Sequence, residues 1–212
     1  MTAMGKCYIV GAGEFILDTP PESGDFIIAA DGGYDSLAAK KIAPSLLIGD
    51  MDSRISEKIP DSLEVITYPV EKDETDMHLS YLEGARRGFA DFVILGGTGG
   101  REDHTLANYA LLLYMSERGH RGELVGRESN ATVIRNGKIS LFGKKGGRVS
   151  VFAIGGAAEG VSIEGMKYAA SRIRLSESMP LGVSNSLADG AGSVSVENGA
   201  LLVIYEKGID KR

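Results

Sequence analysis

Short apolar runs in the first 120 or so residues alternate with polar segments that are rich in glycine and aspartate. The runs cover residues 7–10, 26–30, 46–48, 64–68 and 91–95, and helix-like segments separate several of them. Alternation of strands and helices predicts a mostly parallel sheet with helices on its faces. Ligands of such sheets bind beyond the carboxyl ends of the strands, so we expect functional residues in the segments that follow these runs.

An acidic pair, Asp50 and Asp52, follows the run 46–48. Side chains alternate in direction along an extended chain, so both carboxylates point the same way if the strand geometry continues. Two like charges this close repel unless they share a cation or a proton. Mg²⁺ prefers hard oxygen ligands and commonly takes one or two carboxylates together with substrate phosphates. The pair indicates a metal–phosphate site, and the alternative is a solvated turn, in which Gly-Asp and Asp-Ser are common.

Other runs are followed by further acidic segments. Asp31 follows the run 26–30, and the segment 71–76 follows the run 64–68. A helical stripe comes next, formed by Leu79, Leu82 and Ala85. Asp73 and Asp76 are neighbours at the start of this helix, which Thr75 or Asp73 is expected to cap. Capping alone is the alternative explanation for these residues, because acidic first turns are normal.

A glycine-rich loop at residues 96–100, with Thr98 at its centre, follows the run 91–95. Backbone N–H groups and a helix N-terminus favour phosphate at such a loop, and Arg101 adds a cation suited to phosphate. Asp103 would repel phosphate unless it binds a metal or caps the helix. That helix is expected from the stripe Leu106, Tyr109, Ala110 and Leu113, with its end at Gly119.

Two common nucleotide motifs do not match the chain. Ile16 stands at the third glycine position of the dinucleotide fingerprint that begins at Gly11, and no segment has the P-loop spacing. The stronger signal is the convergence of four polar clusters at one edge of one sheet. This convergence predicts a metal–phosphate site.

The pattern changes from Glu123 onward. Strand-like runs flank Asn136-Gly137 and Asn198-Gly199, and Asn-Gly is a strong hairpin signal. We expect a small antiparallel sandwich or barrel of roughly 85 residues, a common domain size. In this part, Lys167 and Tyr168 lie beside each other in sequence, and a polar loop spans residues 180–186. Together they suit a flat, cationic heteroaromatic ligand, although Tyr168 also fits a half-buried sheet position.

Composition limits the class of partner and the compartment. The net charge is −6 and the pI is about 5.2, which argues against nonspecific binding to nucleic acid or to an anionic membrane surface. The single cysteine, Cys7, cannot form an intrachain disulfide, which favours a reducing compartment. No signal-peptide core and no membrane span are expected, so a cytoplasmic location is predicted.

Six segments, in order, resemble the motifs of the thiamine pyrophosphokinase family. They read ADGG at 30–33, GDMDS at 49–53, KDETD at 72–76, GGTGGREDH at 96–104, GMKY at 165–168 and GVSN at 182–185. Each motif alone is weak, but their order across nearly the whole chain is specific. The resemblance implies a transferase, a thiamine diphosphokinase that moves the pyrophosphoryl group of ATP to the hydroxyl of thiamine. The products would be thiamine diphosphate and AMP.

The resemblance also implies an architecture and a set of partners. Residues 1–122 would form a Rossmann-like, mostly parallel α/β domain that binds the nucleotide and carries out catalysis. Residues 123–212 would form an antiparallel β-sandwich domain that binds thiamine and mediates dimerisation. The family further implies Mg²⁺ and a homodimer with active sites at the subunit interface, where thiamine contacts both chains.

The motif positions and the resemblance together assign roles to individual residues. Catalytic roles fall to Asp50, Asp52, Asp76 and Arg101, and the three aspartates also bind the metal. ATP and its metal would contact a second set: Asp31, Gly32, Lys72, Asp73, Thr75, Thr98, Gly99 and Asp103. Thiamine would contact Tyr168, Ser184 and Asn185. Asp76 or Asp52 would accept the proton of the thiamine hydroxyl.

Two other functions remain open from the sequence. The nearer one is a related diphosphokinase that acts on another small alcohol, such as a hydroxymethyl pterin. The more distant one is a non-catalytic sensor that binds a nucleotide or thiamine diphosphate.

Overall fold

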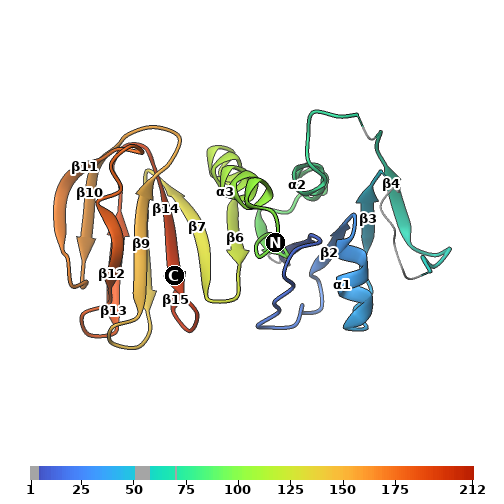
Figure 1. Cartoon of the computed structure of the whole chain (residues 1–212), viewed down its shortest axis with the longest axis horizontal. Helices are drawn as coiled ribbons and strands as arrows, with labels where there is room; N and C mark the ends of the chain where they lie inside the picture. Colours follow the sequence, from blue (N-terminus) through green and yellow to red (C-terminus); the bar gives the residue numbers. More distant parts are fainter. Residues whose placement is uncertain (1–4, 51–57, 70) are drawn as a thin grey trace. The chain divides into compact units, whose positions relative to one another are not determined.

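The computed structural model describes residues 5–50, 58–69 and 71–212, and it has a mixed α/β fold with many strands and few helices (Figure 1). The chain divides into two compact units. The first comprises residues 1–111 and 120–126, and the second comprises residues 112–119 and 127–212. Asp52 lies outside the described residues.

The first unit contains a parallel sheet. Its strands are β1 (Cys7–Val10), β2 (Phe26–Ala30), β3 (Leu46–Gly49), β4 (Glu64–Thr67), β5 (Asp91–Leu95) and β6 (Arg121–Val125). The helices of the described residues are α1 (Gly33–Ala39), α2 (Asp76–Arg86) and α3 (Glu102–Glu117). The strands lie in the order β6-β5-β1-β2-β3-β4, and each pairs with its neighbours in parallel. The predicted strands and their parallel pairing are confirmed.

Helices cover both faces of this sheet. Cys7 and Tyr8 are consecutive in β1, so their side chains point to opposite faces. Tyr8 joins a core cluster with Leu37 of α1. On the other face, a Cβ added to Gly84 of α2 would lie 2.9 Å from the Cys7 sulfur. Strands covered on both faces read as continuous apolar runs, which explains why the sequence revealed them clearly.

The helix α3 forms where the sequence predicts it, and it ends before Gly119, but its predicted apolar stripe is not its buried face. Leu106 is 69% exposed. The buried side chains are Asn108, Leu111, Leu112 and Met115. Apolar residues occupy most sides of this helix, so apolar periodicity alone did not identify the buried face. Asn108 is buried because its side-chain amide donates a hydrogen bond to the Gly97 carbonyl at 2.9 Å.

The second unit consists of two antiparallel sheets. One has the order β12-β9-β14-β7 and the other has the order β11-β10-β13-β8-β15. Their bounds are β7 (Ser129–Arg135), β8 (Lys138–Phe142), β9 (Arg148–Ala153), β10 (Ala158–Glu164), β11 (Ala170–Leu175), β12 (Gly182–Ser186), β13 (Ala191–Ser195), β14 (Ala200–Glu206) and β15 (Asp210–Lys211). Apolar residues from both sheets form one core cluster, which includes Leu141 of β8 and Val203 of β14.

The prediction of hairpins at the two Asn-Gly pairs is wrong. β7 pairs with β14 and β8 pairs with β13, so each Asn-Gly pair connects strands of different sheets. The two connections bind each other: Asn136 N–H donates to the Gly199 carbonyl at 3.1 Å, and Gly199 N–H donates to Asn136 Oδ1 at 2.9 Å. Asn136 has φ 46°, which asparagine tolerates. A tight Asn-Gly turn can join two paired strands of one sheet or two strands of different sheets. Here the burial of both sheets in one core favours the connection between sheets.

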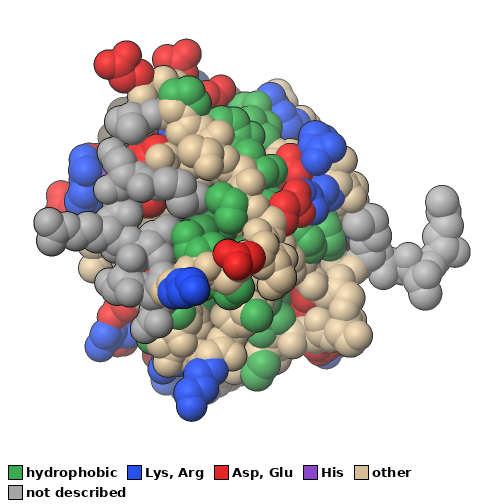
Figure 2. Space-filling view, turned by 90° about the vertical axis from the view of Figure 1, so that its right-hand side faces the viewer, with side chains coloured by type: hydrophobic (Ala, Val, Ile, Leu, Met, Phe, Trp, Pro, Cys, Tyr) green, Lys and Arg blue, Asp and Glu red, His purple; other side chains and the backbone are tan. Residues whose placement is uncertain are grey.

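The surface mixes charged and apolar side chains. On the face shown in Figure 2, acidic and basic side chains lie interspersed among apolar ones. In the second unit, the segment that enters β12 exposes Met179 and Leu181. No helix in the described part of the chain is long and apolar enough to cross a membrane.

Candidate functional site

Backbone hydrogen bonds join the segments that follow β2, β3 and β4. Asp31, directly after β2, donates its N–H to the Ile48 carbonyl of β3 at 2.7 Å. Tyr68, directly after β4, donates its N–H to the Gly49 carbonyl at 3.0 Å. Asp50 follows Gly49 and is half-buried. The carboxyl ends of three neighbouring strands thus bring Asp31 and Asp50 to one edge of the sheet.

Two glycine-containing loops meet where the strand order reverses, between β1 and β5. Gly13 donates its N–H to the Gly96 carbonyl at 2.8 Å, and Glu14 donates its N–H to the Thr98 carbonyl at 2.8 Å. Gly96 has φ 62°, and a Cβ at this position would lie 2.2 Å from the Gly11 carbonyl oxygen. Only glycine permits this approach. The point of reversal in a doubly wound sheet is where ligands bind.

The start of α2 lies at the same edge. Thr75 is its N-cap, and the Thr75 hydroxyl accepts the His78 N–H at 3.2 Å, which confirms the predicted cap. The Met77 sulfur lies 2.9 Å from the position that a Cβ on Gly11 would occupy. The helix therefore begins beside the loop that follows β1. Gly32 precedes α1 as its N-cap, and Asp73 is exposed just before α2.

Asp76, at the first position of α2, forms an ion pair with Lys72. The Lys72 ammonium donates to Asp76 Oδ1 at 2.7 Å, and both side chains are half-buried. The sequence placed both residues at the site but did not predict that they pair. The contact gives Asp76 an internal countercharge, and a bound cation at Asp76 would compete with Lys72 for the same oxygen.

Arg101 and Asp103 form an exposed pair at the start of α3. The Arg101 guanidinium donates to both Asp103 oxygens, at 3.1 and 2.6 Å. Asp103 Oδ1 also accepts the His104 N–H at 2.9 Å. These hydrogen bonds, with that from Arg101 dominant, lower the pKa of the Asp103 carboxyl. Asp103 thus orients Arg101 beside the glycine loop, and the remaining guanidinium donors suit a phosphate.

The donor chemistry of this edge fits Mg²⁺. Asp50 and Asp76 supply hard carboxylate oxygens, and a triphosphate would supply the rest. β2 lies between β1 and β3, so the loops that follow β1 and β3 are roughly 10 Å apart, a span that a triphosphate can bridge. Within residues 5–50, 58–69 and 71–212, no group of three or more His, Cys, Asp or Glu side chains is arranged to hold a metal ion.

The predicted thiamine contacts lie in the second unit. Tyr168, between β10 and β11, is 59% exposed and is not the half-buried sheet residue of the alternative interpretation. The Lys167 ammonium lies 5.1 Å from the centroid of the Tyr168 ring. Ser184 is exposed in β12, whereas Asn185 is only 3% exposed and binds the backbone of Tyr168. The structure thus brings the GMKY and GVSN segments together.

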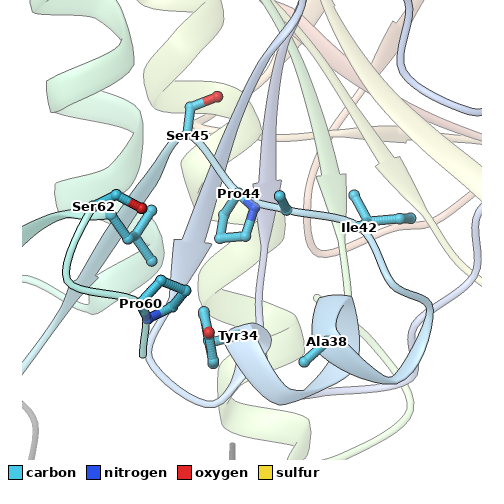
Figure 3. Close-up of a pocket in the computed structure, with 9 residues that line it drawn as sticks. Tyr34, Ala38, Ile42, Pro44, Ser45, Pro60 and Ser62 are labelled. Carbon is cyan, nitrogen blue, oxygen red and sulfur yellow. The ribbon is translucent and has the colours of Figure 1, made fainter. Parts of the chain in front are cut away.

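A cavity of about 220 Å³ in the first unit lies away from the predicted site (Figure 3). Its lining includes Tyr34 and Ala38 of α1, together with residues that precede β3 and β4, such as Ser45 and Ser62. It therefore lies near the amino ends of these strands, whereas the motif residues follow the carboxyl ends. The Tyr34 hydroxyl is directed to the Lys58 carbonyl at 3.2 Å.

Sequence reasoning missed the contribution of Gly13 and Glu14 to the site. Their N–H groups hold the glycine loop in place, as described above. The signal is the pair Gly11 and Gly13 after the first strand: the dinucleotide fingerprint fails at Ile16, but a short glycine loop there still permits close approach of a ligand.

Comparisons with known proteins agree with this geometry. A family model described as the catalytic domain of thiamin pyrophosphokinase matches residues 21–123. A curated relative, the thiamine pyrophosphokinase of Bacillus subtilis (strain 168), is 29% identical over 185 residues, covering 84% of this chain and 85% of that protein.

Solved structures extend the likeness to both units. The thiamine pyrophosphokinase of B. subtilis aligns with a TM-score of 0.84 and 25% identity, over 95% of this chain and 98% of that chain. The thiamin pyrophosphokinase of Geobacillus thermodenitrificans aligns with a TM-score of 0.82 and 27% identity, over 95% of this chain and 97% of that chain. The family model, the curated relative and these structures together make this chain similar to thiamine pyrophosphokinases, by sequence and, over both units, by structure.

Proposed function

We propose that this chain transfers the pyrophosphoryl group of ATP to the hydroxyl of thiamine, giving thiamine diphosphate and AMP. The observation that carries the proposal is the convergence at the carboxyl edge of the parallel sheet. There the loops after β1 and β5 are hydrogen-bonded to each other, at the point where the order of the strands reverses. The start of α2 lies beside the loop after β1, and Asp31 and Asp50 follow β2 and β3 at the same edge of the sheet. The similarity to known thiamine pyrophosphokinases supports the same reaction.

The first unit would act as a Rossmann-like nucleotide-binding domain. Backbone N–H groups of the loop that holds Thr98 and Gly99, together with the N-terminus of α3, suit the phosphates of ATP. Arg101 would take charge that develops on the phosphates during transfer. Asp31 and Gly32, together with Lys72, Asp73 and Thr75 at the start of α2, would complete the ATP contacts.

Mg²⁺ is the metal that the donor set favours, with Asp50, Asp52 and Asp76 as the protein ligands. Bound there, it would neutralise the triphosphate and stabilise the leaving AMP. Lys72 already neutralises Asp76 through their ion pair, so Asp76 would exchange one cation for the other. The ammonium group released from Asp76 would then be available for a phosphate oxygen.

The transfer step is a displacement at the β-phosphorus of ATP. The thiamine hydroxyl oxygen forms a bond to this phosphorus, and the bond from it to the oxygen that bridges the α- and β-phosphates breaks. AMP leaves with that oxygen. A carboxylate at the sheet edge, Asp76 or Asp52, accepts the hydroxyl proton. Phosphoryl chemistry of this kind depends mainly on positioning and electrostatic stabilisation, which the converging loops supply.

The second unit would be a β-sandwich domain that binds thiamine. Tyr168 offers an exposed aromatic ring for a flat cationic ligand, and Ser184 adds a hydroxyl. We further propose a cytoplasmic homodimer in which thiamine contacts Tyr168 and Ser184 of one chain and the catalytic carboxylates of the other. Asn185 would belong to the same substrate segment.

The reaction is tested by incubating the purified chain with Mg-ATP and an alcohol substrate, followed by separation of the nucleotides. AMP that forms only when thiamine is present is the expected result. AMP that forms only with a hydroxymethyl pterin would overturn the assigned substrate. Binding of thiamine diphosphate or nucleotide without AMP formation would instead indicate a sensor.

A further inference from the structure

The GVSN segment contains a β-bulge that redirects its side chains. Gly182 pairs with Val151 of β9 and Asn185 pairs with Val149, so two residues of β12 oppose one residue of β9. Ser184 lies in the left-handed region at φ 59°, and its N–H donates to the Ser150 hydroxyl at 3.1 Å. Such a bulge interrupts the alternation of a strand. As a result, Val183 and Ser184 are both exposed, and Asn185 turns inward.

The first residue of the segment permits the close approach of the two strands. A Cβ added to Gly182 would lie 2.2 Å from the Val151 carbonyl oxygen. A side chain at this position would push β12 away from β9 and displace the bulge. The glycine, the left-handed serine and the inward asparagine are therefore parts of one local structure.

The Asn185 carboxamide holds the main chain of Tyr168 at two points. Its Oδ1 accepts the Tyr168 N–H at 2.9 Å, and its Nδ2 donates to the Tyr168 carbonyl at 2.7 Å. The same Oδ1 accepts the Ser186 N–H at 2.9 Å. Lys167 N–H also donates to the Ser186 carbonyl at 2.9 Å. Both polar groups of the buried Asn185 are thus engaged with backbone rather than directed toward solvent.

The clamped residue carries an exposed ring outside regular secondary structure. The strands β10 and β11 end and begin on either side of Tyr168, so no ladder of strand hydrogen bonds fixes its backbone. The Lys167 ammonium lies over the ring at 5.1 Å from its centroid. A cation on one face leaves the opposite face for a flat cationic ligand, because two cations on the same face would repel.

We propose that Asn185 is a positioning residue that fixes the Tyr168 ring as the stacking surface for thiamine, rather than a residue that contacts the substrate. This role rests on the proposed function for the identity of the ligand. The GVSN motif alone does not reveal this role. The bulge turns Asn185 inward, and Asn185 orders the Tyr168 ring in the connection between β10 and β11. Loss of the clamp frees the backbone of Tyr168 and lowers the population of the binding orientation.

A double-mutant cycle tests whether Asn185 acts through the ring. Asn185→Ala is expected to raise the KM for thiamine by about tenfold, with the KM for ATP unchanged. Tyr168→Ala is expected to raise the same KM at least as much. The double variant should match Tyr168→Ala alone, because without the ring the clamp has nothing to position. Multiplied effects, or an unchanged KM in Asn185→Ala, would overturn the proposal.

A fluorescence measurement tests the clamp independently of activity. The chain contains no tryptophan, so Tyr168→Trp introduces a single reporter at the ring position. Adding Asn185→Ala to this variant should lower the emission anisotropy and increase quenching by acrylamide. Asn185→Asp, which keeps the acceptor and loses the donor to the Tyr168 carbonyl, should give an intermediate change and serves if the alanine variant does not fold.

Asn136→Ala provides the matched control. Asn136 also binds backbone through its side chain, accepting the Gly199 N–H at 2.9 Å, but it lies beyond the opposite end of β13 from the GMKY segment. Adding Asn136→Ala to the Tyr168→Trp variant should leave the emission anisotropy unchanged. Unchanged anisotropy in folded Asn185 variants would overturn the positioning role even if thiamine is the substrate. A lowered anisotropy without thiamine turnover would retain the positioning role and reject the proposed function.

Discussion

Among single residues, Asp50 has the most direct link between sequence, placement and proposed chemistry. It follows β3 directly, and the neighbouring segments after β2 and β4 are hydrogen-bonded to this strand. Its position is therefore set by the sheet rather than by a separate loop. A carboxylate held in this way can bind a metal without the entropic cost of ordering a flexible segment.

Asp50→Asn is expected to lower kcat by about 100-fold or more while the fold is retained, because the amide cannot replace the negative charge. Steady-state AMP release and circular dichroism measure the two effects. Asp61→Asn is the matched control, since Asp61 is an exposed aspartate before β4, near its amino end. Normal Mg²⁺-dependent turnover in Asp50→Asn would contradict the assignment.

Cys7 shows how burial can dominate the chemistry of a residue. Its side chain is buried in β1, and this burial raises the pKa of the thiol from 9.0 to about 12. The folded state therefore disfavours the thiolate. Because the folded pKa is raised, this contribution to stability is complete below about pH 9 and is lost as the pH rises toward about 12.

We compare the unmodified chain with the Cys7→Ala variant, which has no thiol to titrate. Above pH 9, the free energy of unfolding of the unmodified chain should fall relative to that of the variant, by up to about 1.4 kcal/mol per pH unit. Urea unfolding of both proteins at pH 8 and pH 10 measures this difference, and the comparison cancels other titrating groups. A difference between the two proteins that does not change with pH would contradict the burial argument.

Among secondary-structure elements, α3 separates what periodicity predicts from what packing decides. Its existence and its end follow from local sequence. Its buried face does not, because the residues that face the core include the polar Asn108, held by the Gly97 carbonyl. An apolar residue can therefore lie on the exposed side while a polar one is buried.

Two leucines of α3 test this orientation. Leu112 is 1% exposed and Leu106 is 69% exposed, so Leu112→Ala should lower the free energy of unfolding by about 2–5 kcal/mol. Leu106→Ala, the same chemical change on the same helix, should lower it by about 0.5 kcal/mol or less. Denaturant titration compares them, and equal losses would show that the helix presents a different face.

The sequence predicted the strands best where both faces of the sheet are buried. Strands β1, β2 and β5 lie at the predicted residues because parallel strands covered on both faces are continuous apolar runs. The Asn-Gly connections and the clamp at Asn185 were not predictable in this way. Both depend on contacts between segments far apart in sequence: the pairing of β7 with β14 and the bulge of β12 against β9.

The sequence predicted which residues form the candidate site, but not which of them form ion pairs with each other. The motifs placed Lys72 and Asp76, and also Arg101 and Asp103, at one edge of the sheet. Spacing alone did not show that each cation binds the neighbouring aspartate, at 2.7 and 2.6 Å respectively. The two charged groups of such a pair can bind a ligand or bind each other, and only the directions of the side chains distinguish these cases.

At the level of the whole molecule, the proposed homodimer predicts complementation between inactive chains. Chains carrying Asp50→Asn and chains carrying Tyr168→Ala are each expected to be nearly inactive at low thiamine concentration. Random mixing of a dimer makes half of the assemblies mixed, each with one intact site, so activity should recover to about a quarter of the unmodified level. Recovery in verified mixed dimers supports shared sites, and its absence would contradict them.

The fate of the β-phosphorus of ATP distinguishes the transfer of a pyrophosphoryl group in one step from the transfer of a single phosphoryl group. The chain is incubated with Mg²⁺, thiamine and ATP labelled at the β-phosphorus, and the labelled products are separated. We expect the label to move to thiamine diphosphate, with one AMP formed for each thiamine diphosphate and no thiamine monophosphate as an intermediate. Label retained in ADP, with thiamine monophosphate as the product, would contradict it.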